Sequence, residues 1–303
     1  MKHSESIVLL NEFCTNSSNK AMFDAILNLI PRNGSISEVD SVQTSIINTC
    51  SIDGFLLICY FLSRQSEIFK CKYSDELNNL FNSLKSISDL VCENNWNEAR
   101  LEWIKFTKMK AIQKDETVVY DFFLNEFDSY YDSCASILQQ YEYDNICDNL
   151  KCKLTSIKES RSAAFMLKKK RTVFLEETFK KRNISCKEVK FDIQGKFHVE
   201  RNDMCNGTRA LLNHRFINGT PPFLIISNGF NALNINEVPK KIIVSDMEYS
   251  LIGLTKYKNN RRHYTLVLFL EERFIEIDNL KKEIIEPIDL IEIQFKYIFY
   301  LKK

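Results

Sequence analysis

The chain has 303 residues, which is enough for one large core or for two lobes packed together. Its 41 basic and 40 acidic side chains give a formal net charge of +1, which excludes a global field that would steer it toward nucleic acid or a membrane surface. A hydrophobic fraction of 45% and an aromatic fraction of 12% are typical of a globular protein and exclude extended disorder.

The N-terminal segment MKHSESIVLLNEF has acidic and polar side chains where a signal peptide has a basic stretch and then an apolar one. The longest apolar run, from Gly54 to Leu62, is too short to cross a bilayer, which takes about 20 residues. Ten cysteines are scattered along the chain without an export signal, so we expect reduced thiols. The sequence therefore predicts an intracellular protein, cytoplasmic or nuclear, without a membrane partner.

Residues from about Ser41 to Glu177 have the pattern of helices, since apolar side chains recur at spacings of three and four and no proline interrupts them. The clearest series is Leu77, Leu80, Phe81, Leu84, Ile87 and Val91. We therefore expect a helical lobe over residues 1–182.

Two short basic clusters, Lys168 to Arg171 and Lys180 to Arg182, lie at the end of this lobe. The simplest interpretation is a solvated helix face at the junction of the lobes. The alternatives are a nuclear import signal or a contact with an acidic partner. We expect no nucleic-acid partner.

From about Lys187 the period changes to two, as in VKFDIQGKFHVE with a turn at Gln194 and Gly195. Further runs rich in β-branched and aromatic residues follow: PPFLIIS, KKIIVS, YSLIGLTKY, YTLVLFLEE, RFIEID and FKYIFYL. These runs predict an antiparallel β lobe over residues 183–303. Strands that follow helices favour the α+β class.

Cys50 has the surroundings of a thiol nucleophile. The polar residues Asn48 and Thr49 precede it, and an apolar helical run from Ile52 to Leu62 follows it. A helix N-terminus beside an imidazolium favours the thiolate. The alternative is that Cys50 packs as a small hydrophobic residue. We assign that structural role to Cys59, Cys71, Cys92 and Cys134.

His263 is the best candidate for a general base among the four histidines. It begins HYTLVLFLEERFIEIDN, which predicts a strand, a turn at Glu271 and Glu272, and a returning strand that ends at Asp278. Both residues would then lie at the open end of one hairpin, where the carboxylate can orient the imidazole. The alternative interpretation is a surface histidine at a strand end and an aspartate that terminates a strand.

The order of these motifs resembles the ubiquitin-specific protease family: N-T-C before an apolar helix, then PPFLII, a P-x-x-I strand, Y-S-L-I-G-L, H-Y-T and F-I-E-I-D-N. The match covers Asn48 to Phe61 and roughly Pro221 to Leu280. It is similar to the divergent branch of SUMO isopeptidase-like and mobile-element-encoded peptidase domains. The resemblance implies a papain-like cysteine peptidase fold, with an N-terminal helical thumb lobe and a C-terminal antiparallel β palm lobe.

By this resemblance, Cys50 is the nucleophile, His263 the base and Asp278 the residue that orients the histidine, and Asn279 occupies the neighbouring position. The reaction would be hydrolysis of the C-terminal Gly-linked bond of ubiquitin or of a ubiquitin-like modifier such as SUMO. The resemblance implies no cofactor. A catalytically inactive module that binds such a modifier or another protein is the alternative from a different class.

The chain departs from the family at two positions. The side chain that donates to the oxyanion would fall at Ser45, or at Gln43 if the register shifts, and Asn48 and Asn279 are further oxyanion or orienting candidates. Arg262 stands where the family has a glycine, directly before His263 and Tyr264. We take Arg262 and Tyr264 as substrate-binding candidates.

The family often carries a zinc-holding finger of two C-x-x-C pairs. Here four residues separate Cys147 from Cys152, and eighteen separate Cys186 from Cys205. On this spacing we expect no metal and a finger that has lost its ligands. A third functional hypothesis is a helical DNA-associated protein in which the basic segment near Lys168 makes the contact.

Overall fold

The computed structural model describes residues 26–31, 35–39, 42–65, 74–122, 134–150, 152, 156–161, 165–166, 182–186, 188–193, 196–201, 205–227, 232–258, 263–270, 272–279, 281, 283–285 and 293–303. Some sequence predictions lie wholly or partly outside these residues. They concern Arg262, Cys71, the turn at Gln194 and Gly195, Glu271, the cluster from Lys168 to Arg171, and all but the last residue of the cluster from Lys180 to Arg182.

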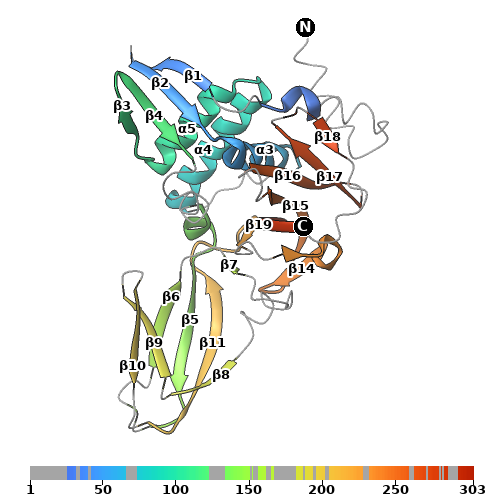
Figure 1. The fold of residues 1–303 in the computed structure, drawn as a ribbon. Helices are drawn as coiled ribbons and strands as arrows, with labels where there is room; N and C mark the ends of the chain where they lie inside the picture. The colour runs from blue at the N-terminus through green and yellow to red at the C-terminus, as the bar shows by residue number, and fades with distance from the viewer. Residues whose placement is uncertain are drawn as a thin grey trace.

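Helices α3 (Cys50–Gln65), α4 (Asp75–Cys92) and α5 (Trp96–Thr107) lie in the upper part of the molecule as drawn in Figure 1, between the strands β1–β4 and β16–β18. The hydroxyl of Ser74 caps α4 by accepting a hydrogen bond from the backbone of Leu77. The side chains from Phe55 to Leu62 are all buried, so α3 is the central helix, with α4 packed against it and α5 against α4. None of the described helices is long and apolar enough to span a membrane.

A small four-stranded sheet lies beside the helices, in the order β1-β2-β4-β3. Its strands are β1 (Ser35–Val39), β2 (Val42–Ile47), β3 (Ile112–Lys114) and β4 (Thr117–Asp121). Strand β2 runs directly into the loop before α3 and pairs in parallel with β4. This sheet therefore fixes where the chain enters α3.

The β lobe is a nine-stranded sheet with the main order β18-β17-β16-β15-β19-β12-β7, while β13 pairs with β19 and β14 with β15. Its strands are β7 (Phe165–Met166), β12 (Phe223–Ser227), β13 (Ala232–Leu233), β14 (Lys241–Val244), β15 (Met247–Lys258), β16 (His263–Leu270), β17 (Arg273–Asp278), β18 (Glu283–Ile285) and β19 (Ile293–Lys302). Helix α3 packs on β15 and β16. Apolar side chains from α3 and from this sheet share one core.

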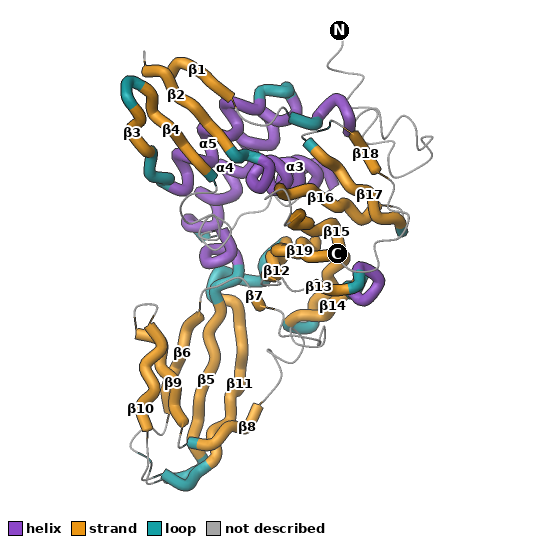
Figure 2. Tube along the Cα trace, in the orientation of Figure 1, coloured by secondary structure: helices purple, strands orange, loops and turns teal. Residues whose placement is uncertain are grey.

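A third part, which we call the finger, extends away from the β lobe (Figures 1 and 2). It consists of the sheet β6-β5-β11-β8 and the hairpin β9–β10. Its strands are β5 (Tyr141–Cys147), β6 (Ser156–Arg161), β8 (Arg182–Ser185), β9 (Glu188–Ile193), β10 (Lys196–Arg201) and β11 (Thr208–Phe216). The hairpin confirms the alternation in VKFDIQGKFHVE.

The α+β class is confirmed, since a helical N-terminal region precedes a β-rich C-terminal region whose main strands pair antiparallel. The expectation that residues from about 41 to 177 are mostly helical missed the strands in this stretch, which are β2, β3, β4, β5, β6 and β7. Segments such as TVVYD and YEYDNIC are rich in β-branched and aromatic residues, and this preference outweighs the apolar spacing there. The finger sheet takes strands from both sides of residue 182.

Gly253 lets α3 and two strands approach one another closely. A Cβ built on Gly253 would lie 2.6 Å from the carbonyl oxygen of Val267 and 3.3 Å from Ile58 Cδ1. Gly54, on α3, faces the same sheet, but a Cβ there would lie 3.6 Å from Leu266 Cβ, which is an ordinary contact. The two glycines therefore differ in how much space is open to a methyl group.

We predict that Gly253→Ala lowers the free energy of unfolding by about 1–3 kcal/mol, because the methyl group forces backbone to move. The matched variant Gly54→Ala should leave stability unchanged or raise it by up to about 1 kcal/mol, since alanine is the better helix former. Urea unfolding of both variants measures the difference. Equal stability of the two would contradict this account of the interface between α3 and the sheet.

Candidate active site

Cys50 is the first residue of α3, and the sequence before it forms a tight entry into the helix. Asn48 adopts a φ of 57°, in the left-handed region that asparagine tolerates better than most residues. Its Nδ2 donates to Asp121 Oδ1 on β4 at 2.8 Å. This bond ties the loop before Cys50 to the small sheet. The cysteine itself is buried, with 5% of its surface exposed.

His263 and Asp278 lie together at the open end of the β16–β17 hairpin, as expected from the sequence. Leu270 pairs with Arg273, so the chain reverses between these two residues, where Glu272 has a φ of 63°. His263 Nε2 lies 2.8 Å from Asp278 Oδ1, and both side chains are buried. When Nε2 carries the proton and donates it to the carboxylate, Nδ1 has the lone pair that can accept a proton from a thiol.

The sulfur of Cys50 lies against the strand that carries the histidine. It accepts hydrogen bonds from the backbone amides of Tyr264 and Ser51. Tyr264 directly follows His263 on β16, so the first turn of α3 and the first residues of β16 meet at the thiol. The thiol of Cys50 thus contacts the backbone of the residue that follows His263, and His263 contacts Asp278.

Burial raises the pKa of the Cys50 thiol to about 11, against the opposing effect of the Tyr264 amide. The negative charge of Asp53 raises this pKa further. At neutral pH the resting thiol is therefore protonated. Reaction at Cys50 requires transfer of this proton to a nearby base.

Both oxygens of Asp278 have partners. Oδ1 binds His263, and Oδ2 lies 3.1 Å from Nζ of Lys258 on β15. Burial alone would raise the pKa of Asp278, but the hydrogen bonds from His263 and Lys258 hold it below its usual value. The carboxylate is therefore ionised and fixed in orientation.

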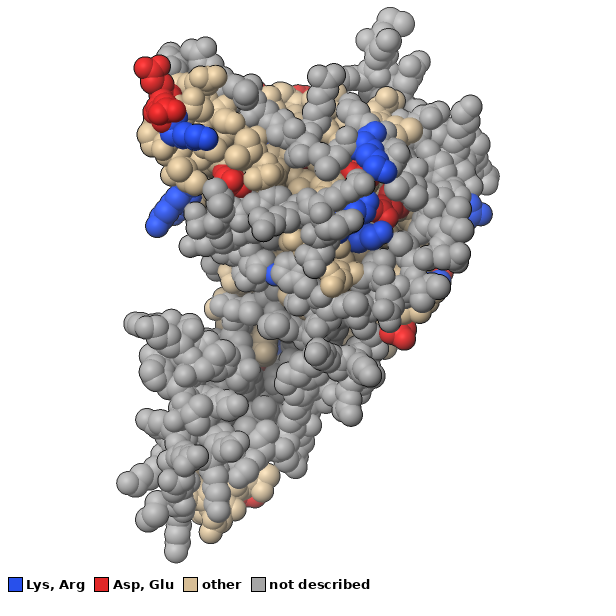
Figure 3. Space-filling view, viewed as in Figure 1, with Lys and Arg blue, Asp and Glu red and all other residues tan. Residues whose placement is uncertain are grey.

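Charges around this carboxylate alternate in sign. Lys258 also contacts Glu276 Oε1 at 2.8 Å, and Lys256 contacts Glu276 Oε2 at 2.8 Å. On the face drawn in Figure 3, basic and acidic side chains of the described residues accordingly lie side by side and form no large patch of one sign.

The four oxyanion or orienting candidates lie in different surroundings. Gln43 is exposed on β2 and accepts a hydrogen bond from the Thr117 hydroxyl. It lies four residues before Ile47, the last residue of β2, which at about 3.3 Å per residue is a distance of about 13 Å along the strand. Ser45 is half-buried on the same strand. Asn48 donates to Asp121, as described above, and Asn279 Nδ2 donates to Asp53 Oδ2 at 3.0 Å. The side-chain amides of both asparagines thus donate to carboxylates.

Tyr264, a substrate-binding candidate, is almost fully buried. Its ring contacts that of Tyr257 on β15, with centroids 4.8 Å apart. Of the cysteines assigned to packing, Cys59 and Cys134 are fully buried and Cys92 is half-buried. Burial raises the pKa of Cys134 to about 12, which keeps it inert.

Sequence reasoning missed Asp53 and Arg100. Arg100 Nε lies 2.8 Å from Asp53 Oδ1 and Arg100 Nη2 lies 2.9 Å from Asp53 Oδ2, with both side chains buried. The Thr49 hydroxyl also donates to this carboxylate, at 2.8 Å. One signal was visible in the sequence: Asp53 is a lone charge in the apolar run that follows Cys50.

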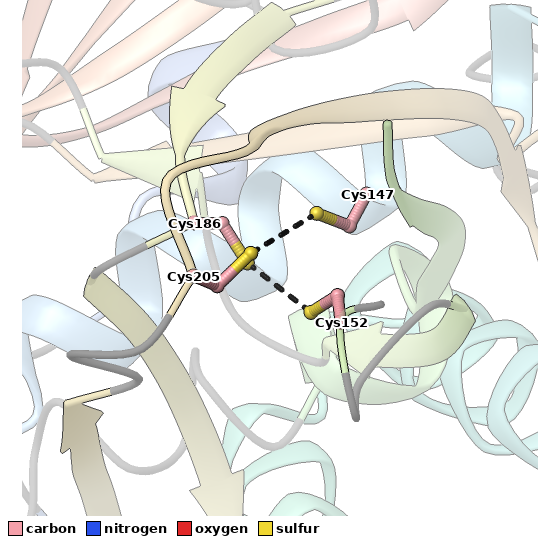
Figure 4. A group of neighbouring side chains, drawn as sticks. All are labelled: Cys147, Cys152, Cys186 and Cys205. Atoms are coloured by element: carbon pink, nitrogen blue, oxygen red, sulfur yellow. Dashed lines mark hydrogen bonds between the residues drawn. The ribbon is translucent and has the colours of Figure 1, made fainter. Parts of the chain in front are cut away.

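Four cysteines lie close together in the finger, at the end where β5 and β8 finish and β11 begins (Figure 4). They are Cys147 at the end of β5, Cys152 in the turn after it, Cys186 after β8 and Cys205 before β11. Their sulfur atoms all lie within 4.8 Å of one another and are buried. Cys147 and Cys205 are 3.7 Å apart, and Cys152 and Cys186 are 3.6 Å apart.

These thiols fit a zinc ion. Four thiolates at about 2.3 Å around a tetrahedral Zn²⁺ lie about 3.8 Å from one another. Gly207 is part of the cradle, because its backbone N–H donates to Cys205 Sγ and a Cβ there would come within 2.8 Å of Cys147 Sγ. The expectation of no metal rested on spacing along the chain. That spacing does not decide whether the cysteines can bind a metal, because pairing of β5 with β11 and of β8 with β11 brings distant cysteines together.

Comparison with known proteins identifies the family. The model of the family described as dopamine receptor-interacting protein 1 matches residues 33–291. The chain belongs to this family. That description names no peptidase, so the resemblance to ubiquitin-specific proteases stays a hypothesis that depends on the motifs and the site.

Solved structures with a similar arrangement include the papain-like protease of MERS coronavirus. It has 9% sequence identity and a TM-score of 0.45, with 93% of this chain and 71% of that chain covered. A SAGA DUB module containing Ubp8, bound to ubiquitin aldehyde, has 15% identity and a TM-score of 0.42, with 95% and 76% covered. Likeness at this level does not identify an activity or a substrate.

We predict that the purified protein contains about one zinc ion per chain, held by the four thiolates of the finger. Cys186→Ser should lose the zinc and lower the melting temperature, whereas the matched variant Cys92→Ser should keep both. Elemental analysis and thermal unfolding, with and without a chelator, make the measurement. Equal zinc content in the two variants would exclude the cluster as the metal site.

Proposed function

We propose that the chain is a papain-like cysteine isopeptidase that hydrolyses the C-terminal Gly-linked bond of ubiquitin or of a ubiquitin-like modifier such as SUMO. One observation carries the proposal. The His263–Asp278 pair lies at the open end of the β16–β17 hairpin. Tyr264, the residue after His263, donates its backbone N–H to the sulfur of Cys50. These residue types in this order support nucleophilic catalysis by a thiol.

In the proposed reaction, His263 Nδ1 takes the proton of the Cys50 thiol, and the sulfur attacks the carbonyl carbon of the terminal glycine. The carbon–nitrogen bond then breaks, and the amine leaves with the proton from His263. Water hydrolyses the resulting thioester in the second half of the reaction. Asp278 keeps the ring oriented through Nε2 and stabilises the imidazolium that forms.

Because Cys50 is buried, its thiolate should form only together with an imidazolium at His263. A thiolate alone in this environment is costly, whereas a thiolate beside an imidazolium is compensated. Backbone amides at the N-terminus of α3 supply donors for the developing oxyanion, since their partial positive charge points toward the sulfur. The zinc-binding finger would be structural, because four thiolates leave no open position on the metal.

The alternative is an inactive binding module of the same fold, and two observations favour it. Burial raises the pKa of Cys50 to about 11. The side-chain amides of Asn48 and Asn279 donate to carboxylates, and Ser45 offers only a hydroxyl. For such a module, the partner is a ubiquitin-like modifier or, given the family's description, a dopamine receptor. For either function we propose an intracellular site of action and no nucleic-acid partner.

We predict that a ubiquitin or SUMO probe with a C-terminal electrophile forms a covalent adduct with the wild-type protein. Cys50→Ala should abolish the adduct, and Asp278→Asn should slow its formation at least about tenfold, because the imidazole loses its orienting charge. Cys92→Ala is the matched control and should react at the wild-type rate. Gel shift and intact-mass measurements follow the adduct.

The same probes distinguish the alternative. A protein that binds the unreactive modifier in calorimetry but never forms the adduct is an inactive module. A protein that neither binds nor reacts with ubiquitin or SUMO contradicts the isopeptidase proposal and the modifier-binding form of the alternative, and leaves only a module that binds another protein.

A further inference from the structure

Asp53 places a buried negative charge next to the candidate nucleophile. It lies in the first turn of α3, three residues after Cys50, and only 2% of it is exposed. Residues three apart on a helix lie on the same face, with Cβ atoms about 5–6 Å apart. An uncompensated carboxylate at this position opposes formation of a thiolate at Cys50.

Arg100 compensates this charge from a different helix. It lies on α5, its side chain is 1% exposed, and two of its nitrogens contact the two oxygens of Asp53 in a bidentate arrangement. This geometry is the strongest that an arginine and a carboxylate form. Removing one partner of such a pair leaves a buried charge without compensation, which is far more costly than replacing both.

The same carboxylate joins the helices to the β lobe. Asn279 Nδ2 donates to Asp53 Oδ2, and Asn279 directly follows Asp278, the residue that binds His263. Thr49, directly before Cys50, donates to the same oxygen. Asp53 therefore connects the residue before the nucleophile with the residue after the orienting aspartate.

We propose that Arg100 is a positioning residue of the candidate active site. By pairing with Asp53 it removes a net negative charge beside Cys50 and holds the end of β17 against the start of α3. The proposal depends on the proposed role of Cys50 as nucleophile. It assigns a part in that chemistry to a helix that contributes no group to the reaction.

Other charged and titratable groups lie on the elements around Cys50, and they stay the same in the test variants. His263 and Asp278 lie on the palm side, with Lys258 and Glu276 behind Asp278. Asp121 lies on the side of β4, held by Asn48. Asp53 is among the causes that raise the pKa of Cys50, after burial. A unit charge about 6 Å from the sulfur changes the equilibrium fraction of thiolate about tenfold or more, at the effective dielectric constant of about 20 that is typical of protein sites.

The test follows alkylation of Cys50 by iodoacetamide between about pH 6 and pH 10, with peptide mass spectrometry to resolve each cysteine. Arg100→Met should slow the reaction about tenfold at each pH below the plateau, because Asp53 loses its compensating charge. Arg100→Lys keeps the charge and should stay within about threefold of wild type. The double variant Asp53→Asn with Arg100→Met removes both charges and should recover the wild-type profile.

Arg215→Met is the matched control, because Arg215 pairs with Glu142 on the exposed surface of the finger. It should leave the profile unchanged. A folded Arg100→Met protein with the wild-type pH profile would overturn the proposal. The proposal would also fail if the double variant were as slow as the single one, since the lost reactivity would then not arise from an uncompensated Asp53.

Thermal unfolding of the same variants tests, independently of thiol reactivity, whether Arg100 compensates the charge of Asp53. We expect Arg100→Met to melt well below wild type and the double variant to melt above Arg100→Met. The double variant melting no higher than the single one would overturn the pairing. If Cys50 is not alkylated at any pH while Cys92 is, the nucleophile hypothesis fails and the melting temperatures still test the charge pairing.

Discussion

The contact between the first turn of α3 and the open end of the β16–β17 hairpin is the constraint on which the site depends. Cys50 belongs to a helix whose apolar side chains are buried almost throughout, and His263 belongs to a strand in the sheet that this helix packs against. Neither side chain can move far without disturbing a close-packed core. The position of the thiol relative to the imidazole is therefore set by packing that extends well beyond the site.

Compensation of buried charge is the second organising feature. Asp53 is paired with Arg100, Asp278 with His263 and Lys258, and Glu276 with Lys256 and Lys258. Buried charges persist in proteins only when they are paired and hydrogen-bonded. Asp53, the carboxylate whose charge acts on Cys50, would oppose a thiolate more strongly if it were unpaired. The pairs balance one another, because Arg100, Lys256 and Lys258 match the three carboxylates in charge.

The parts of the site that sequence could predict are those with a local pattern. Asn48 and Thr49 before an apolar run mark the start of the helix at Cys50, and a strand, turn and strand place His263 near Asp278. Both depend on residues close together in the chain. The α+β class follows from the same periodicities, because helix and strand repeats differ.

The parts that sequence could not predict depend on contacts between distant segments. Arg100 is one of many basic residues until α5 packs on α4 and brings it to Asp53. The four finger cysteines have an unusual spacing that becomes a compact cluster only once β8 and β5 both pair with β11. Short strands inside a long proline-free stretch were masked by helix-like apolar spacing.

The most direct test of the account is the distance between Cys50 Sγ and His263 Nδ1 in an experimental structure of the wild-type protein. The account predicts that these atoms lie about 3–4 Å apart, within reach of a hydrogen bond to sulfur, with Nε2 directed at Asp278. A separation above about 6 Å, or a ring turned so that Asp278 binds neither nitrogen, would contradict it.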